Sequence, residues 1–214
     1  MRTREAILRA AAEVLDESGF AGASITEIVK RAGATTGAMY FHFKSKDELA
    51  RAVMDSQSET VLPYLGSKGL QRLVDITLVW SWQLQVDPML RAGVRLAVEQ
   101  GAFGVQDATS FHDWKRIMEE CLDEALADGE LREDVEPSEL AEFVVSACTG
   151  TQLYSQLVSG RSDLPRRTVR MWSFLLPGVA VPETVERIDL DLRRGKGDPE
   201  PLPRPAGESP DDDA

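Results

Sequence analysis

The side chains best suited to chemistry cluster between residues 26 and 46, where hydroxyl, imidazole and ammonium groups recur at short intervals. Such groups hydrogen-bond to base edges and contact phosphates, so their spacing indicates binding to duplex DNA. Gly37 belongs with them because a residue without a side chain lets the backbone approach a surface closely. With one arginine near the N-terminus, the candidate DNA contacts are Arg4, Thr26, Thr35, Thr36, Gly37, Tyr40, His42 and Lys46.

No arrangement of residues predicts catalysis. Of the two histidines, His42 lies among the candidate DNA contacts, and His112 stands beside Asp113 without a paired nucleophile. The sequence also lacks a glycine-rich phosphate-binding loop. Cys121 and Cys148 both occur in apolar helical contexts, which favours reduced core thiols over a disulfide or a metal pair. We therefore expect no catalytic residues, no bound metal and no cofactor.

Two short helices joined by a tight turn must position the candidate DNA contacts. Ser24 and Glu27 form a capping box that begins the first helix, and Gly33 suits the left-handed residue that ends it. A second short helix is expected at residues 36–43, and the capping signature recurs at residues 45–48. This order is that of a helix-turn-helix, whose second helix enters the DNA major groove. The alternative is a plain helical corner that buries Ile28, Met39, Tyr40 and Phe43.

The same segment resembles the N-terminal DNA-binding region of TetR-family transcriptional regulators. The resemblance runs from about Arg4 to Val53, and its most specific part is the run G-A-M-Y-F-H-F-K-S-K-D-E-L at residues 37–49. Many relatives carry a basic residue where this chain has Thr35 and Thr36, so no base preference can be transferred. The resemblance implies a homodimer that binds a double-stranded DNA operator, with a C-terminal helical bundle that binds a small molecule and dimerises.

The composition indicates a soluble globular protein. Of the 214 residues, 43% are hydrophobic and 28% are charged, which is enough apolar material for a buried core. There is no run of about 18 apolar residues that would span a membrane, and charges interrupt the N-terminus before a signal peptide could form. We expect a cytoplasmic protein that does not associate with membranes.

The net charge of -12 argues at first against nucleic acid as a partner. Residues 1–50 nevertheless hold seven basic and seven acidic residues, so the whole excess of acid lies in residues 51–214. A DNA-binding region without net charge relies on a few basic groups placed beside phosphates. The salt dependence of DNA binding should therefore be moderate and not steep.

Apolar residues recur with helical periodicity along most of the remaining chain, and no segment alternates as a strand would. The sequence therefore predicts an all-α protein. Its expected domains are a helix-turn-helix domain at residues 1–46, a ligand-binding and dimerisation bundle at residues 47–192, and a disordered acidic, proline-rich tail at residues 193–214. Helices are expected at residues 3–18, 45–62, 70–86, 89–100, 111–127, 137–159 and 165–176.

A second candidate site lies in the C-terminal bundle, where apolar stripes carry a few polar groups. Gln57 falls on the inward stripe of the helix at residues 45–62, where a buried amide needs a partner. Apolar walls with a few convergent polar groups are typical of a ligand pocket, although ordinary core packing explains the same stripes. The helix at residues 45–62 would touch both domains, so we expect it to transmit ligand binding to the DNA-binding domain.

Residues 125–167 and 169–183 resemble γ-butyrolactone-type autoregulator receptors, which repress antibiotic-production genes until a lactone, butenolide or furan signal arrives. That resemblance implies a tryptophan that stacks on the signal, matched by Trp114, and hydrogen-bonding partners matched by Gln57 and Thr149. The full set of expected ligand contacts is Gln57, Trp80, Trp114, Met118, Thr149 and Gln152. The expected dimer contacts are Leu157, Val169, Trp172 and Leu175.

Two alternative functions are compatible with the same residues. One is a repressor of an efflux or catabolic operon that responds to another class of ligand. The other is a pseudo-receptor that binds DNA but has lost its response to ligand. The inward stripes hold few carboxylates, which favours a neutral or anionic signal over the cationic drugs that efflux repressors bind.

Overall fold

The computed structural model describes residues 2–56, 66–103 and 107–196. The N-terminal helices are α1 (Arg2–Gly22), α2 (Ile25–Arg31), α3 (Thr36–His42) and α4 (Lys46–Asp55). The remaining elements, in which η marks a 3-10 helix, are α5 (Gly69–Val86), α6 (Pro88–Glu99), η2 (Gln100–Phe103), α7 (Thr109–Ala127), α8 (Pro137–Ser159), α9 (Leu164–Val179), α10 (Pro182–Arg187) and η3 (Leu192–Lys196).

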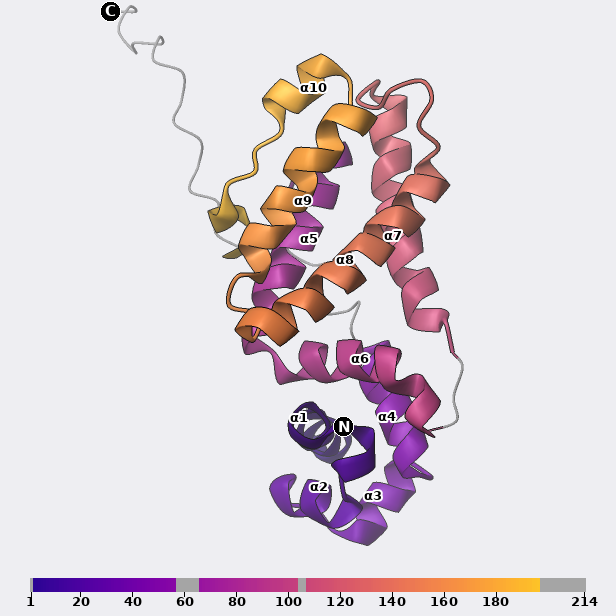
Figure 1. The fold of residues 1–214 in the computed structure, drawn as a ribbon. Helices are drawn as coiled ribbons and strands as arrows, with labels where there is room; N and C mark the ends of the chain where they lie inside the picture. Colours follow the sequence, from indigo (N-terminus) through magenta and orange to yellow (C-terminus); the bar gives the residue numbers. More distant parts are fainter. Residues whose placement is uncertain (1, 57–65, 104–106, 197–214) are drawn as a thin grey trace, which may run out of the picture.

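Helices α1 to α4 gather at one end of the molecule, and α5, α7, α8 and α9 form a bundle at the other (Figure 1). Helix α6 lies across the junction between the two groups. The described residues contain no strand, only an isolated antiparallel bridge between Leu131 and Ala180. The predicted all-α fold, a helix-turn-helix followed by a helical bundle, is confirmed.

The three helices that follow α1 begin where the sequence predicts, because each is capped by a hydroxyl group. Ser24, Thr35 and Ser45 each accept a hydrogen bond of 3.1 Å from the backbone N–H three residues later. Such caps satisfy amide groups that the first helical turn leaves without partners. Gly33 adopts φ +62° between α2 and α3, which confirms the predicted left-handed turn.

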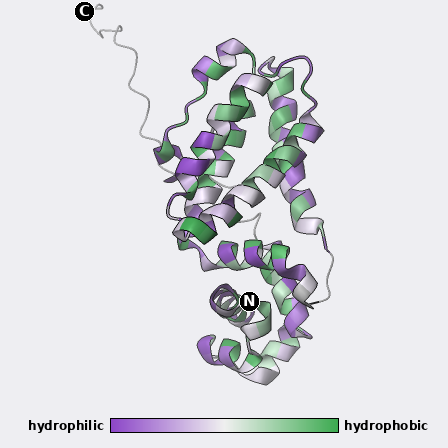
Figure 2. Ribbon diagram, viewed as in Figure 1, coloured by the Kyte–Doolittle hydropathy of each residue, from purple (hydrophilic) through white to green (hydrophobic). Residues whose placement is uncertain are grey.

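The N-terminal helices surround their own apolar core, which also takes residues from α6. Met39 and Phe43 hold α3 in place, since neither side chain is more than 1% exposed. Ala92 and Leu96 of α6 belong to the same cluster and are fully buried. Figure 2 shows hydrophobic and hydrophilic residues alternating around these helices, as expected of amphipathic elements. The core of the N-terminal helices therefore includes residues of α4 and α6, which lie beyond the boundary predicted after residue 46.

Helix α1 was expected to end at Ser18, but the helix resumes after a kink and reaches Gly22. The kink is at Gly19, whose φ of 66° favours a residue without a side chain. The Nη2 atom of Arg95 would lie 2.6 Å from a Cβ at this position. Glycine therefore allows both the kink and the close approach of α6.

The larger core surrounds α5, which is apolar on nearly all sides as the sequence suggests. Leu73, Leu78 and Leu84 are fully buried within it. Trp172 of α9 is also fully buried, and its Nε1 donates a hydrogen bond of 2.7 Å to Thr77 Oγ1 on α5. This bond satisfies the single polar atom of a fully buried indole.

The C-terminal end differs from the prediction. Helix α9 continues through Pro177 to Val179, and α10 and η3, which follow it, were not expected. The tail expected from residue 193 includes η3 residues that are held on α5: Arg194 Nε and Nη2 each lie 2.7 Å from an oxygen of Asp75. A composition rich in proline, glycine and acid does not reveal this ion pair. Residues 57–62 of the predicted fourth helix lie outside the described residues.

Candidate functional site

Helix α3 has one face on the N-terminal core and another in solvent. Its exposed residues include Thr36, Gly37 and Tyr40, and the side chain of Tyr40 is 51% exposed. Thr35 is exposed too, and although its Oγ1 accepts the capping bond, this hydroxyl can still donate one hydrogen bond and accept a second. Four of the five predicted contacts on and just before α3, all except His42, are thus exposed in one segment.

The other four predicted DNA contacts differ in how exposed they are and in what they contact. Arg4 and Thr26 are exposed, and the Arg4 guanidinium lies 5.1 Å from the centre of the Phe43 ring. His42 and Lys46 are half-buried. The Lys46 ammonium stacks 4.4 Å from the centre of the Phe20 ring, and partial burial lowers its pKa.

Phe41 was not predicted as a contact, yet it is the most exposed large side chain of α3, at 85%. Its ring meets that of His42 edge to face, with the ring centres 5.1 Å apart. The signal was present in the sequence: with Met39 and Phe43 facing the core, helical geometry turns the residue two positions after Met39 outward. Phe41 was not predicted as a contact because an apolar side chain is usually expected in the core.

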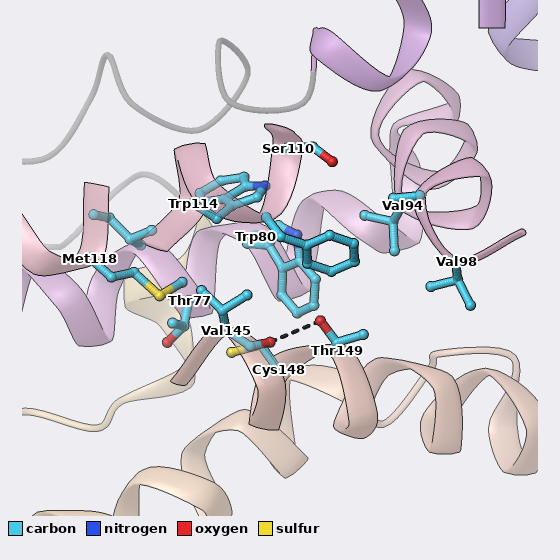
Figure 3. Close-up of a pocket in the computed structure, with 13 residues that line it drawn as sticks. Thr77, Trp80, Val94, Val98, Ser110, Trp114, Met118, Val145, Cys148 and Thr149 are labelled. Atoms are coloured by element: carbon cyan, nitrogen blue, oxygen red, sulfur yellow. Dashed lines mark hydrogen bonds between the residues drawn. The ribbon is translucent and has the colours of Figure 1, made fainter. Parts of the chain in front are cut away.

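An apolar cavity lies in the C-terminal bundle, between α5, α6, α7 and α8 (Figure 3). Four of the six predicted ligand contacts, Trp80, Trp114, Met118 and Thr149, line it together. Among the described residues, none of those in its wall carries a charge. The other lining residues are Ile76, Thr77, Val94, Ala97, Val98, Ser110, Phe111, Val145 and Cys148.

The remaining two predicted ligand contacts lie elsewhere. Gln57 falls outside the described residues. Gln152 is 1% exposed, and its Oε1 accepts hydrogen bonds of 3.3 Å from both Nε and Nη2 of Arg161. Arg161 also donates to Gln156, at 2.7 Å. Gln152 thus secures the end of α8 and does not reach the cavity.

Two hydroxyl groups in the cavity wall, those of Thr77 and Thr149, already donate hydrogen bonds within the protein. Thr77 Oγ1 accepts the bond from Trp172 and donates to Val74 O at 2.8 Å. Thr149 Oγ1 donates to Val145 O at 2.8 Å, which leaves only its lone pairs for a ligand. Burial raises the pKa of the Cys148 thiol to about 12, so this thiol is neutral. The cavity is therefore suited to an uncharged molecule.

Helix α6 has one face on the cavity and another on the DNA-binding helices. Val94 and Val98 line the cavity. On the other side, Arg91 Nε lies 2.7 Å from Asp16 Oδ2 of α1, and Arg95 Nη1 donates to the Asp16 carbonyl at 2.8 Å. A displacement of α6 would therefore act on α1 directly.

Exposed apolar side chains gather on α8 and α9. Leu157, a predicted dimer contact, is 86% exposed. Val169 and Leu175 are half-buried against the C-terminal core, and Trp172 is fully buried in it, so Trp172 cannot contact a partner as expected. The exposed large apolar residues of these two helices are Phe143, Leu153, Tyr154, Leu157, Val158 and Phe174.

Two further observations concern classes of site that the sequence did not predict. Within the described ranges, no group of three or more histidine, cysteine or carboxylate side chains could hold a metal ion. No described helix combines the length and the apolar character needed to cross a membrane.

Comparison with known proteins covers both parts of the molecule. Residues 7–53 match the family model of bacterial regulatory proteins of the tetR family, and residues 67–182 match the tetracyclin repressor-like C-terminal domain. The A-factor receptor protein of Streptomyces griseus is 37% identical over 193 residues, which cover 90% of this chain and 69% of that protein.

Two solved structures are similar over nearly the whole chain. Native TylP, a TetR regulator from Streptomyces fradiae, superposes with a TM-score of 0.83 at 38% identity, covering 91% of this chain and 94% of that one. A γ-butyrolactone receptor described as an ArpA-like protein superposes with a TM-score of 0.68 at 28% identity, covering 91% and 96%.

Proposed function

The chain belongs to the TetR family of bacterial regulatory proteins, and on this premise we propose that it is a ligand-released repressor of the γ-butyrolactone receptor type. As a homodimer it binds a pseudo-palindromic operator, and a small uncharged signal of the lactone, butenolide or furan class releases it. Its target genes direct antibiotic or other secondary metabolism. The observation that carries the proposal is a single helix, α6, with an uncharged cavity on one face and the DNA-binding helices on the other.

The DNA side of the proposal rests on α3. This helix presents Gly37 and Tyr40 to solvent, and its apolar face is anchored by Met39. Fixed in this way, it could enter a major groove without losing its packing. Base contacts would come from hydroxyl groups and from Phe41, whose apolar ring suits the methyl group of thymine. Phosphate contacts would come from Arg4 and from the basic groups after α3.

The ligand side rests on the chemistry of the cavity. A charged ligand would lose its hydration there without gaining a counter-charge, which is costly. The indoles of Trp80 and Trp114 offer flat apolar surfaces for a ring. The receptor proteins named above, which are similar to this chain over most of its length, support a signal of the same class.

Release would follow from the size of the cavity. The cavity volume is about 40 Å³, which is room for only a few water molecules. A ring with a side chain must therefore push the walls apart. The wall made by Val94 and Val98 belongs to α6, and α6 is tied to Asp16 of α1. To change operator occupancy from nearly full to nearly empty, the ligand must favour the displaced state by about 5.5 kcal/mol. Helix α4, the expected lever, packs on α6 and would move with it.

The homodimer rests on the apolar surface of α8 and α9. Exposed apolar side chains that lie close together typically mark an interface. Arg167 and Arg170 stack over the rings of Tyr154 and Phe174 at 4.7 and 5.0 Å, as expected where aromatic and arginine side chains anchor an interface. Two copies joined there would present two α3 helices to one operator.

Selection from a pool of random duplexes tests the DNA-binding part. The wild-type protein should recover an inverted repeat, and it should elute as a dimer in size-exclusion chromatography with light scattering. Thr36→Ala and Tyr40→Ala should weaken binding to the recovered operator by about 1–3 kcal/mol each. The control is Arg116→Ala, which alters an exposed ion pair on α7 and should not affect binding. A monomer that recovers no repeat at low salt would contradict the proposal.

A further inference from the structure

One hydroxyl group in the cavity wall is buried without a hydrogen-bond partner among the described residues. The Oγ atom of Ser110 is buried and forms no hydrogen bond with any described residue, and Ser110 as a whole is only 8% exposed. Leaving a buried hydroxyl unpaired costs about 1–3 kcal/mol, so such groups call for an explanation. Ser110 lines the cavity beside Trp114.

The position of Ser110 in its helix determines which ligand group it would bind. Ser110 is the second residue of α7, a helix of 19 residues. Amide groups in a first helical turn point outward without intrahelical acceptors, and the helix dipole adds partial positive charge there. This environment favours a ligand oxygen that accepts hydrogen bonds.

The opposite side of the cavity has the complementary preference. Thr149 Oγ1 uses its proton on Val145 O, so it can only accept from a ligand. Figure 3 shows Ser110 between Trp114 and Val94, with Thr149 on the other side of Trp80 from it. A hydrogen-bond donor, Ser110, and an acceptor, Thr149, thus lie on opposite sides of the part of the cavity that the tryptophans line.

We propose that Ser110 is a ligand-binding residue that donates a hydrogen bond to a neutral carbonyl oxygen of the signal. The inference rests on the proposed receptor function and adds the direction in which the signal lies. The carbonyl faces the start of α7, the ring lies between Trp80 and Trp114, and any hydroxyl on the signal faces Thr149. A carboxylate is excluded from this end because none of the described residues lining the cavity is cationic.

Two probes that differ by one oxygen test the assignment. γ-Decalactone carries the ring carbonyl, and 2-hexyltetrahydrofuran is the same molecule without it. Quenching of tryptophan fluorescence reports binding, since Trp80 and Trp114 line the cavity. Ser110→Ala should weaken lactone binding roughly 2- to 10-fold and leave ether binding unchanged. Ser110→Thr, which retains a hydroxyl, should retain the preference for the lactone.

Ser81→Ala is the matched control, because Ser81 is also buried but its hydroxyl already donates to Leu78 O at 2.7 Å. It should change neither affinity. Thermal unfolding without ligand gives a second readout: Ser110→Ala should unfold at the same temperature as wild type or a higher one, since it removes an unpaired hydroxyl.

The outcomes separate this assignment from the proposed function. If wild type binds the lactone but Ser110→Ala keeps the wild-type ratio of lactone to ether affinity, the Ser110 assignment is wrong and the receptor function stands. If wild type selects an operator but binds neither probe, the ligand class of the proposed function is wrong, and the assignment fails with it.

Discussion

Cys148 shows how burial sets the chemistry of a single residue in the cavity wall. Burial raises the pKa of its thiol to about 12, and that of Cys121 to about 11. Both thiols therefore stay protonated in the folded protein at pH values where an unfolded chain would ionise them. Native protein should resist iodoacetamide at pH 8, as read by mass spectrometry, and react after denaturation.

The same shift has a consequence for stability. A raised thiol pKa stabilises the folded state fully below the ordinary value of 9.0, and this contribution falls as pH rises from there towards 12. Denaturant midpoints measured above pH 9 should decline more for wild type than for Cys148→Ala. Rapid alkylation of native protein at pH 8 would contradict the burial of both residues.

Trp114 is the residue whose loss should most affect ligand binding. It is 9% exposed and lies in the cavity wall facing the same space as Trp80. Trp114→Phe keeps an aromatic face, whereas Trp114→Ala removes it at about 1.4 kcal/mol, or roughly tenfold in affinity. Fluorescence titration with γ-decalactone should rank wild type first, then Phe, then Ala. Equal affinities would remove Trp114 from the site.

At the scale of elements, η3 offers a matched pair of adjacent arginines. Arg194 pairs with Asp75, whose side chain is 3% exposed, while Arg193 pairs with Asp191 at the surface. Arg194→Ala leaves the buried Asp75 carboxylate without a counter-charge, although Ser67 and Gln71 still donate to it, and should cost about 3–5 kcal/mol of unfolding free energy. Arg193→Ala should cost about 1 kcal/mol or less. Urea denaturation compares them, and equal losses would mean that η3 contributes little to the bundle.

Helix α6 makes a separate prediction about coupling. Asp16→Asn weakens its ion pair with Arg91 but leaves every residue that lines the cavity in place. The affinity for γ-decalactone should therefore stay within twofold of wild type, roughly 0.4 kcal/mol, while more lactone is needed to release operator DNA in a gel shift. The control is again Arg116→Ala, on α7. If Asp16→Asn responds like wild type, α6 does not act through α1.

Local signals predicted the elements near the N-terminus well, because caps and turns are encoded within three or four residues. Ser24, Thr35 and Ser45 begin their helices through contacts with their own neighbours. The elements after α9 depend on contacts more than one hundred residues away, such as Arg194 with Asp75. No local pattern carries that information.

The candidate sites divide in the same way. Helical periodicity and the family resemblance together placed Trp80, Trp114 and Thr149 around one cavity. They could not reveal that Arg161 binds Gln152, or that the Ser110 hydroxyl has no partner among the described residues, because both facts depend on how helices pack. Trp172 was expected at the dimer interface with the rest of its helix, but its indole donates a hydrogen bond to Thr77 inside the bundle.

At the scale of the whole molecule, the apolar surface of α8 and α9 makes a prediction about assembly. Leu157→Glu places a charge at a side chain that is 86% exposed in the single chain. It should therefore leave the fold intact and abolish the dimer, with loss of operator binding by at least tenfold, about 1.4 kcal/mol. Leu126→Glu, on α7, is the control. Light scattering reports the mass, and a dimeric Leu157→Glu variant would exclude this surface.

Chimeric regulators can be made by exchanging the DNA-binding domain between ligand-binding domains. The shared core described above determines where the two sequences can be joined. Ala92 and Leu96 of α6 complete the apolar core of the DNA-binding helices, although they lie in the C-terminal part of the sequence. A join directly after α4 would leave this core to pack against a helix of another protein in place of α6. Transplants that carry α6 along with α1 to α4 should yield working chimeras, and those that leave it behind should yield insoluble ones.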